Sequence, residues 1–422
     1  MSTPRGACPS LREPMATGDG LLVRLSPAGT GWTPQELSTL SAAAGRFGNG
    51  ILEVTSRGNL QIRGLSPESA VALASEIEAA AIPLRNGLAI DTGPLAGIDA
   101  DEIADPLPLA RALQEAVEAA GLAARLAPKC AVVIDGGGRL PLDNLIADVR
   151  LAADAAAAGH WLISIGGTAQ AARPVGSVSE ADGVLAVVAL LETIAAKGRI
   201  ARGRDLPDAD LAGFGPASPM VSAPPTRAPV GRFPLNDGTL ATAFALPFGQ
   251  VDADTLAAFC AVVSDAGASE IRLAPGRGLI VPGLLAECCA ALETKVIELG
   301  FISDARDPRL RIAACAGAPY CASAHFATRD LGAEIATRAS DLLAGRTLHI
   351  SGCAKGCAEP LAPDFTLLGA EGGCLVLPGD GRNAPATGVV APEEALAALR
   401  LLADTEVTHD RPMARETQPA DS

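Results

Sequence analysis

The chain has 422 residues, of which 49% are hydrophobic and 19% are charged, so its composition is globular and its length suits about three domains. Its formal net charge of −15 argues against general nucleic-acid binding, which requires a basic face. The N-terminal segment lacks the apolar stretch of a secretory signal, and no apolar run is long enough to span a bilayer. We therefore expect a cytoplasmic protein that has no nucleic-acid or membrane partner.

The first predicted elements form a strand, a helix and a hairpin. LLVRL (21–25) alternates as a strand does, and Thr33 and Glu36 have the spacing of a capping box at the start of a helix. Residues 52–64 are typical of a β-hairpin, and residues 67–82 have helical apolar periodicity. The following Ala- and Leu-rich helical stretch and its short apolar strands predict an α+β domain.

The same sequence unit occurs twice, at a shift of about 216–219 residues. Four segments have counterparts: 18–27 with 236–247, 53–65 with 272–284, 130–138 with 346–354, and 148–151 with 364–367. A period this long indicates a duplicated pair of domains rather than a solenoid. The predicted boundaries are 14–75 and 230–296 for two half domains, 76–205 and 297–405 for two α+β domains, 206–229 for a linker, and 406–422 for a disordered tail.

Ten cysteines are many for a chain expected in a reducing compartment, where clustered cysteines indicate metal or redox chemistry. Cys315 and Cys321 form a C-x5-C pair, and Cys353 and Cys357 form a C-x3-C pair. The five-residue gap fits structural zinc poorly, whereas four thiolates on Gly- and Ala-rich loops fit a [4Fe–4S] cluster. We predict that these four cysteines hold such a cluster, with zinc or free thiols as alternatives. The other six are expected to be buried packing residues.

The repeated domain pair and the two cysteine motifs resemble the sulfite and nitrite reductase superfamily. This resemblance implies a pseudo-twofold duplicated nitrite/sulfite reductase fold of the α+β class, with two ferredoxin-like half domains and two α+β domains. It also implies that only the second α+β domain keeps the cluster. In that superfamily the four cysteines hold a [4Fe–4S] cluster, and the last one bridges to the iron of a siroheme.

Several segments resemble, more narrowly, the precorrin-3B synthase family: RGACPSL and MATGDGLLVRL near the start, LRNGLAIDTGPLAGID at 84–99, and HISGCAKGCAEP at 349–360. The resemblance implies an oxygen-dependent monooxygenase of aerobic cobalamin biosynthesis, which hydroxylates precorrin-3A and forms a lactone to give precorrin-3B. It further implies a mononuclear non-haem iron besides the cluster, a tetrapyrrole substrate rich in carboxylates, and NADH-derived electrons from an external donor.

A macrocycle rimmed by carboxylates needs arginine or lysine side chains directed at it. By resemblance, substrate binding falls to Arg57 and Gln61 in a T-x-R-x-x-x-Q motif, to Arg85 in an R-N motif, and to Lys129. The reductases carry a further lysine where this chain has Ala131, which favours binding of a large anion over multi-proton reduction of a small one. The competing interpretation of each basic residue is an ordinary solvated side chain.

The sequence does not identify catalytic residues or the ligands of a second iron. His325, His349 and Glu359 lie near the cysteines, but their spacing does not define a site of two histidines and one carboxylate. No dinucleotide-binding or Walker motif is present, so the electrons are expected from a separate donor. Two alternative functions remain open: a siroheme-dependent assimilatory sulfite or nitrite reductase, and an iron–sulfur electron-transfer protein.

Overall fold

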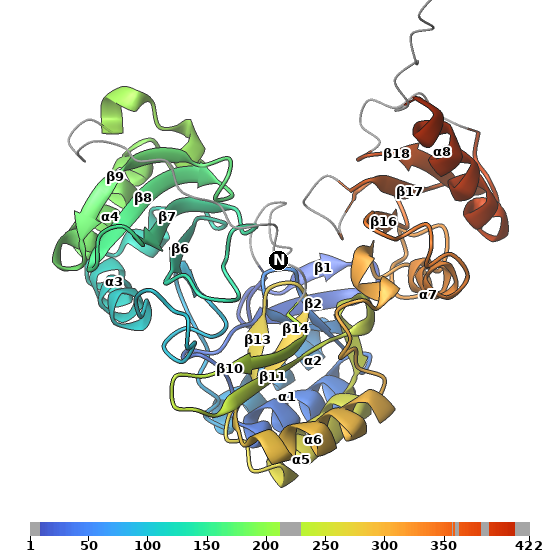
Figure 1. Cartoon of the computed structure of the whole chain (residues 1–422), viewed down its shortest axis with the longest axis horizontal. Coiled ribbons are helices and arrows are strands. Elements are labelled where there is room, and N and C mark those ends of the chain that lie inside the picture. Colours follow the sequence, from blue (N-terminus) through green and yellow to red (C-terminus); the bar gives the residue numbers. More distant parts are fainter. Residues whose placement is uncertain (1–8, 212–228, 357, 359–362, 381–387, 410–422) are drawn as a thin grey trace, which may run out of the picture. The chain divides into compact units, whose positions relative to one another are not determined.

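A computed structural model describes residues 9–211, 229–356, 358, 363–380 and 388–409 (Figure 1). The chain divides into two compact units, residues 1–305 and residues 306–422. Both combine helices with mixed or antiparallel sheets, which confirms the predicted α+β class. Within the described ranges, none of the helices has both the length and the apolar character needed to cross a bilayer.

The first half domain is an antiparallel sheet packed against α1 and α2. Its elements are β1 (Met15–Thr17), β2 (Gly20–Leu25), α1 (Pro34–Phe47), β3 (Ile51–Val54), β4 (Leu60–Leu65) and α2 (Pro67–Ala79). Helix α1 begins at the predicted capping box. The Glu36 N–H donates to Thr33 Oγ1 at 3.1 Å, and the Thr33 N–H donates to Glu36 Oε2 at 2.8 Å.

The second half domain repeats this arrangement around a sheet in the order β10-β11-β14-β13. Its elements are β10 (Gly231–Pro234), β11 (Leu240–Ala245), β12 (Gln250–Asp252), α5 (Ala253–Asp265), β13 (Arg272–Ala274), β14 (Gly278–Leu284) and α6 (Ala286–Glu298). Helix α5 packs against both α6 and α1, so the helices of the two half domains form one layer (Figure 1).

The two half domains exchange backbone pairings. Strand β12 of the second copy pairs with β3 of the first, with Val251 opposite Leu52, and a reciprocal bridge joins Trp32 to Ile271. A shift of 219 residues relates Trp32 to Val251 and also Leu52 to Ile271. These symmetric pairings confirm the duplication predicted from the sequence.

One apolar core serves both half domains, because residues of both copies pack in a single cluster. Phe259 of α5 lies within it, edge-to-face with Phe244 at a centroid distance of 6.1 Å and stacked on Phe301 at 4.8 Å. All three rings are buried. We therefore expect the two half domains to unfold together.

Replacing Phe259 with alanine should destabilise both half domains at once, because it removes a fully buried ring and leaves a cavity in the apolar cluster that contains residues of both copies. We expect the free energy of unfolding to fall by about 3–5 kcal/mol, as measured by urea denaturation. Phe259→Leu, which keeps most of the volume, should cost less. A loss below about 1 kcal/mol for the alanine variant would contradict a shared core.

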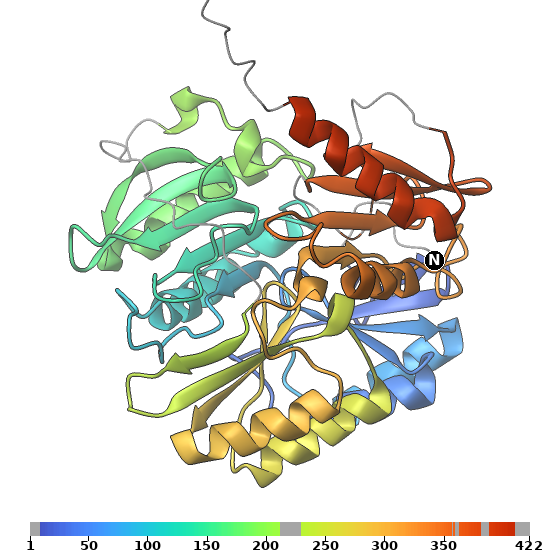
Figure 2. The same cartoon turned by 45° about the vertical axis from the view of Figure 1, so that its right-hand side comes forward.

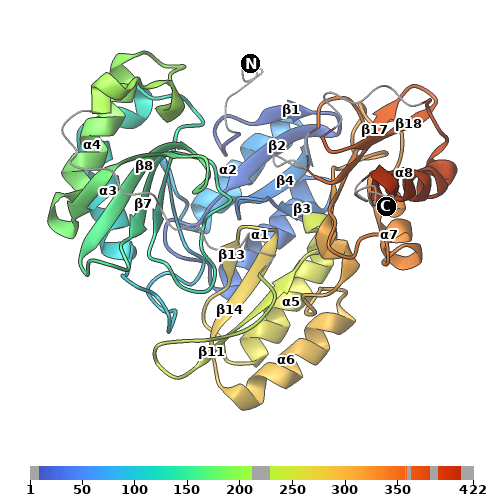
Figure 3. The ribbon, with the colours of Figure 1, turned by 45° about the horizontal axis from the view of Figure 1, so that its top comes forward.

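The first α+β domain has the sheet order β5-β6-β7-β8-β9, in which β5 to β7 are parallel and β8 and β9 are antiparallel. Its elements are β5 (Ala89–Thr92), α3 (Leu107–Ala119), β6 (Ala131–Asp135), β7 (Ala147–Ala153), β8 (His160–Gly167), β9 (Arg173–Ser179) and α4 (Glu180–Ala196). Helices α3 and α4 pack together on one face of this sheet (Figure 3). Trp161 is fully buried in the core that they form with it.

The unit of residues 306–422 repeats this topology in a shorter form, with the sheet order β15-β16-β17-β18. Its elements are β15 (Ile312–Ala314), α7 (Thr328–Arg338), β16 (Leu348–Ser351), β17 (Phe365–Ala370), β18 (Gly373–Pro378) and α8 (Ala395–His409). Helix α8 packs against β18, across the strands of this unit (Figure 2).

The sheet registers confirm the two alignments predicted for the α+β domains. Val132 of β6 pairs with Val149 of β7, and Leu348 of β16 pairs with Phe365 of β17. A shift of 216 residues relates Val132 to Leu348 and Val149 to Phe365. Strands β6 and β16 are therefore equivalent, and so are β7 and β17.

Some predicted boundaries fall inside packed structure, because helical hydrogen bonding and burial continue past them. Helices α2 and α6 extend beyond residues 75 and 296, to Ala79 and Glu298. The predicted linker starts at residue 206, but Leu206 is buried and a 3-10 helix follows it at Asp208–Leu211. The predicted tail starts at 406, but α8 continues to His409. The rest of the linker and tail, 212–228 and 410–422, lies outside the described residues, and the other boundaries stay predictions.

Candidate functional site

The β3–β4 hairpin carries Arg57 at its tip. The turn is closed by hydrogen bonds of 2.9 Å from the Thr55 N–H to the Asn59 carbonyl and from the Gly58 N–H to the Thr55 carbonyl. Gly58 has a φ of +75°, and a Cβ at this position would lie 2.9 Å from the carbonyl carbon of Ala274. Only glycine therefore allows the tip to pack this closely against the β13–β14 hairpin of the second copy.

Asp91 joins Arg57 to Arg85. Arg57 Nη2 donates to Asp91 Oδ2 at 2.6 Å, and Arg85 Nη1 donates to Asp91 Oδ1 at 2.8 Å, so each carboxylate oxygen holds one guanidinium. Only 12% of the Asp91 side chain is exposed. Burial by itself would raise the pKa of Asp91, but the charges and hydrogen bonds of Arg85 and Arg57 outweigh it and lower that pKa. The three side chains thus carry one net positive charge at neutral pH.

Neighbouring polar groups fix both arginines in place. Arg57 Nη1 also donates to the Ile146 carbonyl at 2.8 Å, which ties the hairpin tip to the loop before β7. Arg85 Nη2 faces Ser26 Oγ at 3.4 Å and Asn59 Oδ1 at 3.5 Å. Ser26 Oγ in turn donates to Asn59 Oδ1 at 2.5 Å. The guanidinium groups are therefore held in defined orientations before any ligand binds.

A cavity of about 550 Å³ opens on these residues within the unit of residues 1–305. Its walls come from the β2–α1 loop, the β3–β4 tip, the segment before β5, the end of β5, one face of α3 and the β13–β14 hairpin. The polar lining residues that matter here are Ser26, Arg57, Asn59, Arg85, Asp91 and Arg111. A concave site of this size with a few fixed polar groups is typical of small-molecule binding.

The structure places Arg57 and Arg85, two of the predicted substrate-binding residues, in this cavity. Gln61 is buried on β4 and is not part of the lining. Lys129 is exposed just before β6 and also lies outside the lining. Substrate binding by Gln61 and Lys129 stays a prediction, and the cavity gives no support to it.

Asp91, Asn59, Ser26 and Arg111 line the cavity but were not predicted from the sequence. A carboxylate inside the short apolar strand LAIDT was a usable signal for Asp91, because a charge in a half-buried strand needs a partner. Ser26 and Asn59 lie in loops beside β2 and β4, where serine and asparagine are common for reasons unrelated to ligands. Arg111 belongs to no motif and is recognised only from its place in the cavity wall.

Two predicted cluster ligands leave the sheet of residues 306–422 at one edge. Cys315 directly follows β15, and Cys353 follows β16 by two residues. Because β15 and β16 are parallel neighbours, both cysteines lie at the carboxyl edge of the sheet. Cys321 lies in the loop between β15 and α7, which is joined to the Cys353 loop by a 2.8 Å hydrogen bond from the His325 N–H to the Gly352 carbonyl.

The backbone around Cys315 suits a thiolate. The Gly352 N–H donates to Cys315 Sγ at 3.2 Å, and hydrogen bonds to sulfur of this kind tune iron–sulfur clusters. Thr328 is fully buried at the start of α7, and its hydroxyl donates to the Cys315 carbonyl at 2.7 Å. A Cβ at Gly352 would lie 2.6 Å from the Ala324 side chain, so the loops approach closely only with glycine there. These contacts suit Cys315 as a cluster ligand.

The described candidate ligands Cys315, Cys321 and Cys353 are all partly exposed. The fourth, Cys357, lies outside the described residues, as does Glu359. Over the ranges that the structure does describe, no three His, Cys, Asp or Glu side chains converge as metal ligands. Among the cysteines predicted to be packing residues, burial is confirmed for Cys130, Cys260, Cys289 and Cys374, whereas Cys288 is half-buried and Cys8 is not described.

The first α+β domain has no cysteine at the equivalent edge. The residues directly after β5 and two residues after β6 are Gly93 and Gly137. Acidic residues gather there instead, and Glu102 Oε2 accepts a hydrogen bond from the Gly97 N–H at 2.8 Å. Burial, together with the negative charges of Asp105, Asp99 and Asp135, raises the pKa of Glu102 to about 7.

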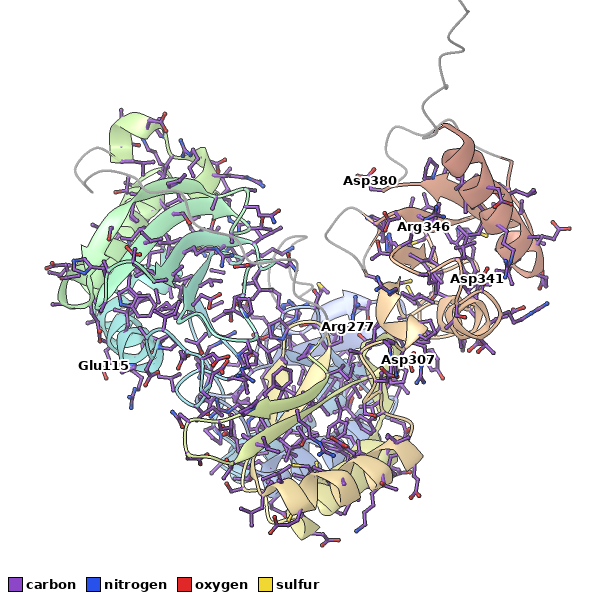
Figure 4. All side chains as sticks on the ribbon, viewed as in Figure 1. Glu115, Arg277, Asp307, Asp341, Arg346 and Asp380 are labelled. Carbon is purple, nitrogen blue, oxygen red and sulfur yellow. The ribbon has the colours of Figure 1, made fainter. Side chains whose placement is uncertain are left out.

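Glu102 should make the stability of the protein depend on pH. The pKa of Glu102 is raised from 4.5 to about 7 in the folded state. Between these two pH values the folded protein keeps a proton on Glu102 that the unfolded chain has lost. The free energy of unfolding therefore falls as pH rises from 4.5 to about 7. Glu102→Gln should remove this loss, with a gain in Tm near zero at pH 4.5 that grows to about 2 °C at pH 8 in calorimetry. Glu115→Gln, at an exposed residue of α3 (Figure 4), is the control. A gain that is the same at all pH values would contradict the assignment.

The comparisons with known proteins agree with this architecture. Residues 13–80 match the nitrite/sulfite reductase ferredoxin-like half domain family. The structure is similar to that of the Mycobacterium tuberculosis NirA protein, with a TM-score of 0.72 over 94% of this chain and 82% of that chain at 20% sequence identity. The predicted fold is confirmed: it is the fold of the nitrite and sulfite reductases.

The sequence comparison is more specific. The chain is 44% identical over 387 residues to a precorrin-3B synthase from Sinorhizobium sp., a match that covers 90% of this chain and 84% of that protein. The chain belongs to the precorrin-3B synthase family, which confirms the narrower resemblance.

Proposed function

We propose that this chain is an oxidoreductase that converts precorrin-3A to precorrin-3B in aerobic cobalamin biosynthesis, the reaction of its family. One atom of O₂ enters the substrate by hydroxylation, and a ring acetate closes the lactone. The second oxygen atom leaves as water, with two protons and with two NADH-derived electrons that reach the chain through an external donor. Membership of the family, at 44% identity over 90% of the chain, is the observation that carries the proposal.

The arginine pair in the cavity supports a substrate rich in carboxylates. Arg57 donates to Asp91 from Nη2 at 2.6 Å and to the Ile146 carbonyl from Nη1 at 2.8 Å, so its Nε–H and the second hydrogen of each Nη remain for a substrate carboxylate. Arg85 donates from Nη1 to both Asp91 and the Ile90 carbonyl, and its Nη2 faces Ser26 and Asn59, so it contributes its charge and its Nε–H. Because Asp91 fixes both groups beforehand, little ordering is needed when the substrate binds. Ile90 and Leu273 on the cavity wall supply apolar surface for a macrocycle face.

We propose that Cys315 and Cys353, at the carboxyl edge of β15 and β16, hold a [4Fe–4S] cluster together with Cys321 and Cys357, the other two cysteines of the two motifs. Such a cluster supplies electrons one at a time. The chain's own contribution is to donate the thiolates and to direct the Gly352 N–H at Cys315 Sγ, a hydrogen bond that favours the reduced, more negative state. The ligands of the mononuclear iron implied by the family are not assigned to any described residue.

The absorption spectrum of the anaerobically purified protein separates this proposal from the siroheme-dependent alternative. We expect a broad iron–sulfur shoulder, about four to five irons per chain, and no resident macrocycle. Siroheme bound at one equivalent per chain would overturn the proposal, because the tetrapyrrole would then be a cofactor and not the substrate. A protein with the cluster that binds no tetrapyrrole at all would favour the electron-transfer alternative.

A further inference from the structure

We propose that Arg111 binds a second carboxylate of the tetrapyrrole at the rim of the cavity, apart from the carboxylate held by Arg57 and Arg85. The inference rests on the proposed function and adds a specificity-determining residue to it. Arg111 lies on α3 and lines the same cavity as the arginine pair, but it comes from a different wall.

Helix α3 presents Arg111 toward the segment that carries Arg85. Arg111, Gln114 and Glu118 recur at helical spacing and all line the cavity, so they share one face of α3. A Cβ at Gly87 would lie 3.7 Å from Gln114 Nε2, which places this face directly against the chain after Arg85. The two cationic positions therefore border one cavity from two elements.

Among the residues that the structure describes, none forms an ion pair that would neutralise the charge of Arg111. Gln114 Nε2 donates to Glu118 Oε1 at 2.7 Å, so the carboxylate that α3 contributes to the cavity lining is engaged by an amide and not by the arginine. Glu115, one helical turn after Arg111, is exposed on α3 (Figure 4) and forms no ion pair with it. Counting only partners from the described ranges, Arg111 has no hydrogen bond or ion pair.

Arg57 and Arg85 differ from Arg111 in this respect, because both form ion pairs with Asp91. In a chain with 48 acidic and 33 basic residues, an unneutralised arginine in a cavity wall is an available carboxylate site. Precorrins carry carboxylates around their whole rim. A substrate whose one carboxylate reaches Arg57 and Arg85 thus presents others to the cavity mouth, where Arg111 would select tetrapyrroles with more carboxylates.

Arg111→Gln in the full-length protein tests this, with Arg199→Gln as the matched control. Arg199 is also exposed and also lacks a partner among the described residues, but it lies after α4 and does not line the cavity. The first readout is fluorescence titration with an octacarboxylic porphyrin, and the second is KM and kcat for precorrin-3A. We expect Arg111→Gln to weaken porphyrin binding and raise KM by about 10-fold, with kcat nearly unchanged. Arg111→Lys should recover part of the loss.

The outcomes separate the two proposals. If the wild-type protein turns over precorrin-3A but Arg111→Gln behaves like Arg199→Gln in both readouts, the second carboxylate site is wrong and the proposed function stands. If the wild type does not turn over precorrin-3A, the proposed function fails whatever Arg111 does. A loss in kcat alone, with porphyrin affinity unchanged, would also overturn the assignment of Arg111 to binding.

Discussion

Replacing Cys353 with serine should remove the iron–sulfur absorbance and abolish turnover. Cys353 follows β16 at the edge of the sheet where Cys315 also emerges, so its sulfur belongs to the proposed ligand set. A serine hydroxyl stays protonated near neutral pH and is a poor substitute for a thiolate. We expect iron content to fall severalfold in the anaerobically purified variant and activity to fall to background.

The matched control for this variant is Cys288→Ser. Cys288 is half-buried on α6, outside both cysteine motifs, so its loss should leave iron content and spectrum unchanged. An unaltered spectrum in Cys353→Ser would exclude Cys353 as a ligand. Equal iron loss in both variants would point to general destabilisation and contradict a specific role for the motif.

Replacing Asp91 with asparagine should lower kcat/KM for precorrin-3A by about 10²-fold, because small misplacements of positioning groups have effects of this size. Asparagine offers one oxygen where Asp91 now holds Arg57 at 2.6 Å with one oxygen and Arg85 at 2.8 Å with the other. The cavity also gains one positive charge. We therefore expect binding of an octacarboxylic porphyrin to be unchanged or tighter while kcat falls, a split that loss of folding would not produce.

The same variant has a stability readout with a defined pH dependence. Because the pKa of Asp91 is lowered in the folded state, its contribution to stability is present above the unfolded value of 3.8 and is lost as pH falls below it. Asp91→Asn should therefore be less stable than wild type by about 2 kcal/mol at pH 7, the order of a lost hydrogen bond to a charged group, and the difference should shrink below pH 4. Glu192→Gln removes the partner of Arg125 in an exposed pair and should change stability by less than about 1 kcal/mol. Wild-type kcat/KM in Asp91→Asn would contradict the positioning role.

Much of the fold follows from local patterns in the sequence. The capping box of Thr33 and Glu36 starts α1 where expected. The alignment of the repeated segments correctly identifies β16 as the counterpart of β6 and β17 as the counterpart of β7. The exchange of β12 onto β3 was not predicted, because a three-residue strand has no periodicity of its own and forms only where the other copy supplies an edge. The predicted domain ends were wrong at α2, α6 and α8 for a related reason: helix ends depend on caps and packing more than on composition.

The site was less predictable than the fold. Arg57 and Arg85 were found from motifs that resemble those of a known family, and both reach the cavity. Asp91 was missed because its importance comes from two arginines that lie 34 and 6 residues away in sequence and meet only in the folded chain. Lys129 matched a motif and is exposed outside the cavity lining, so its part in substrate binding stays a prediction.

The most direct test of the central claim is turnover of precorrin-3A under isotopically heavy O₂ with an external electron donor, followed by mass spectrometry of the product. We predict a product that has gained one heavy oxygen atom and carries a lactone, with no turnover when O₂ is absent. A protein that leaves precorrin-3A unchanged but reduces sulfite or nitrite with a bound siroheme would contradict the account.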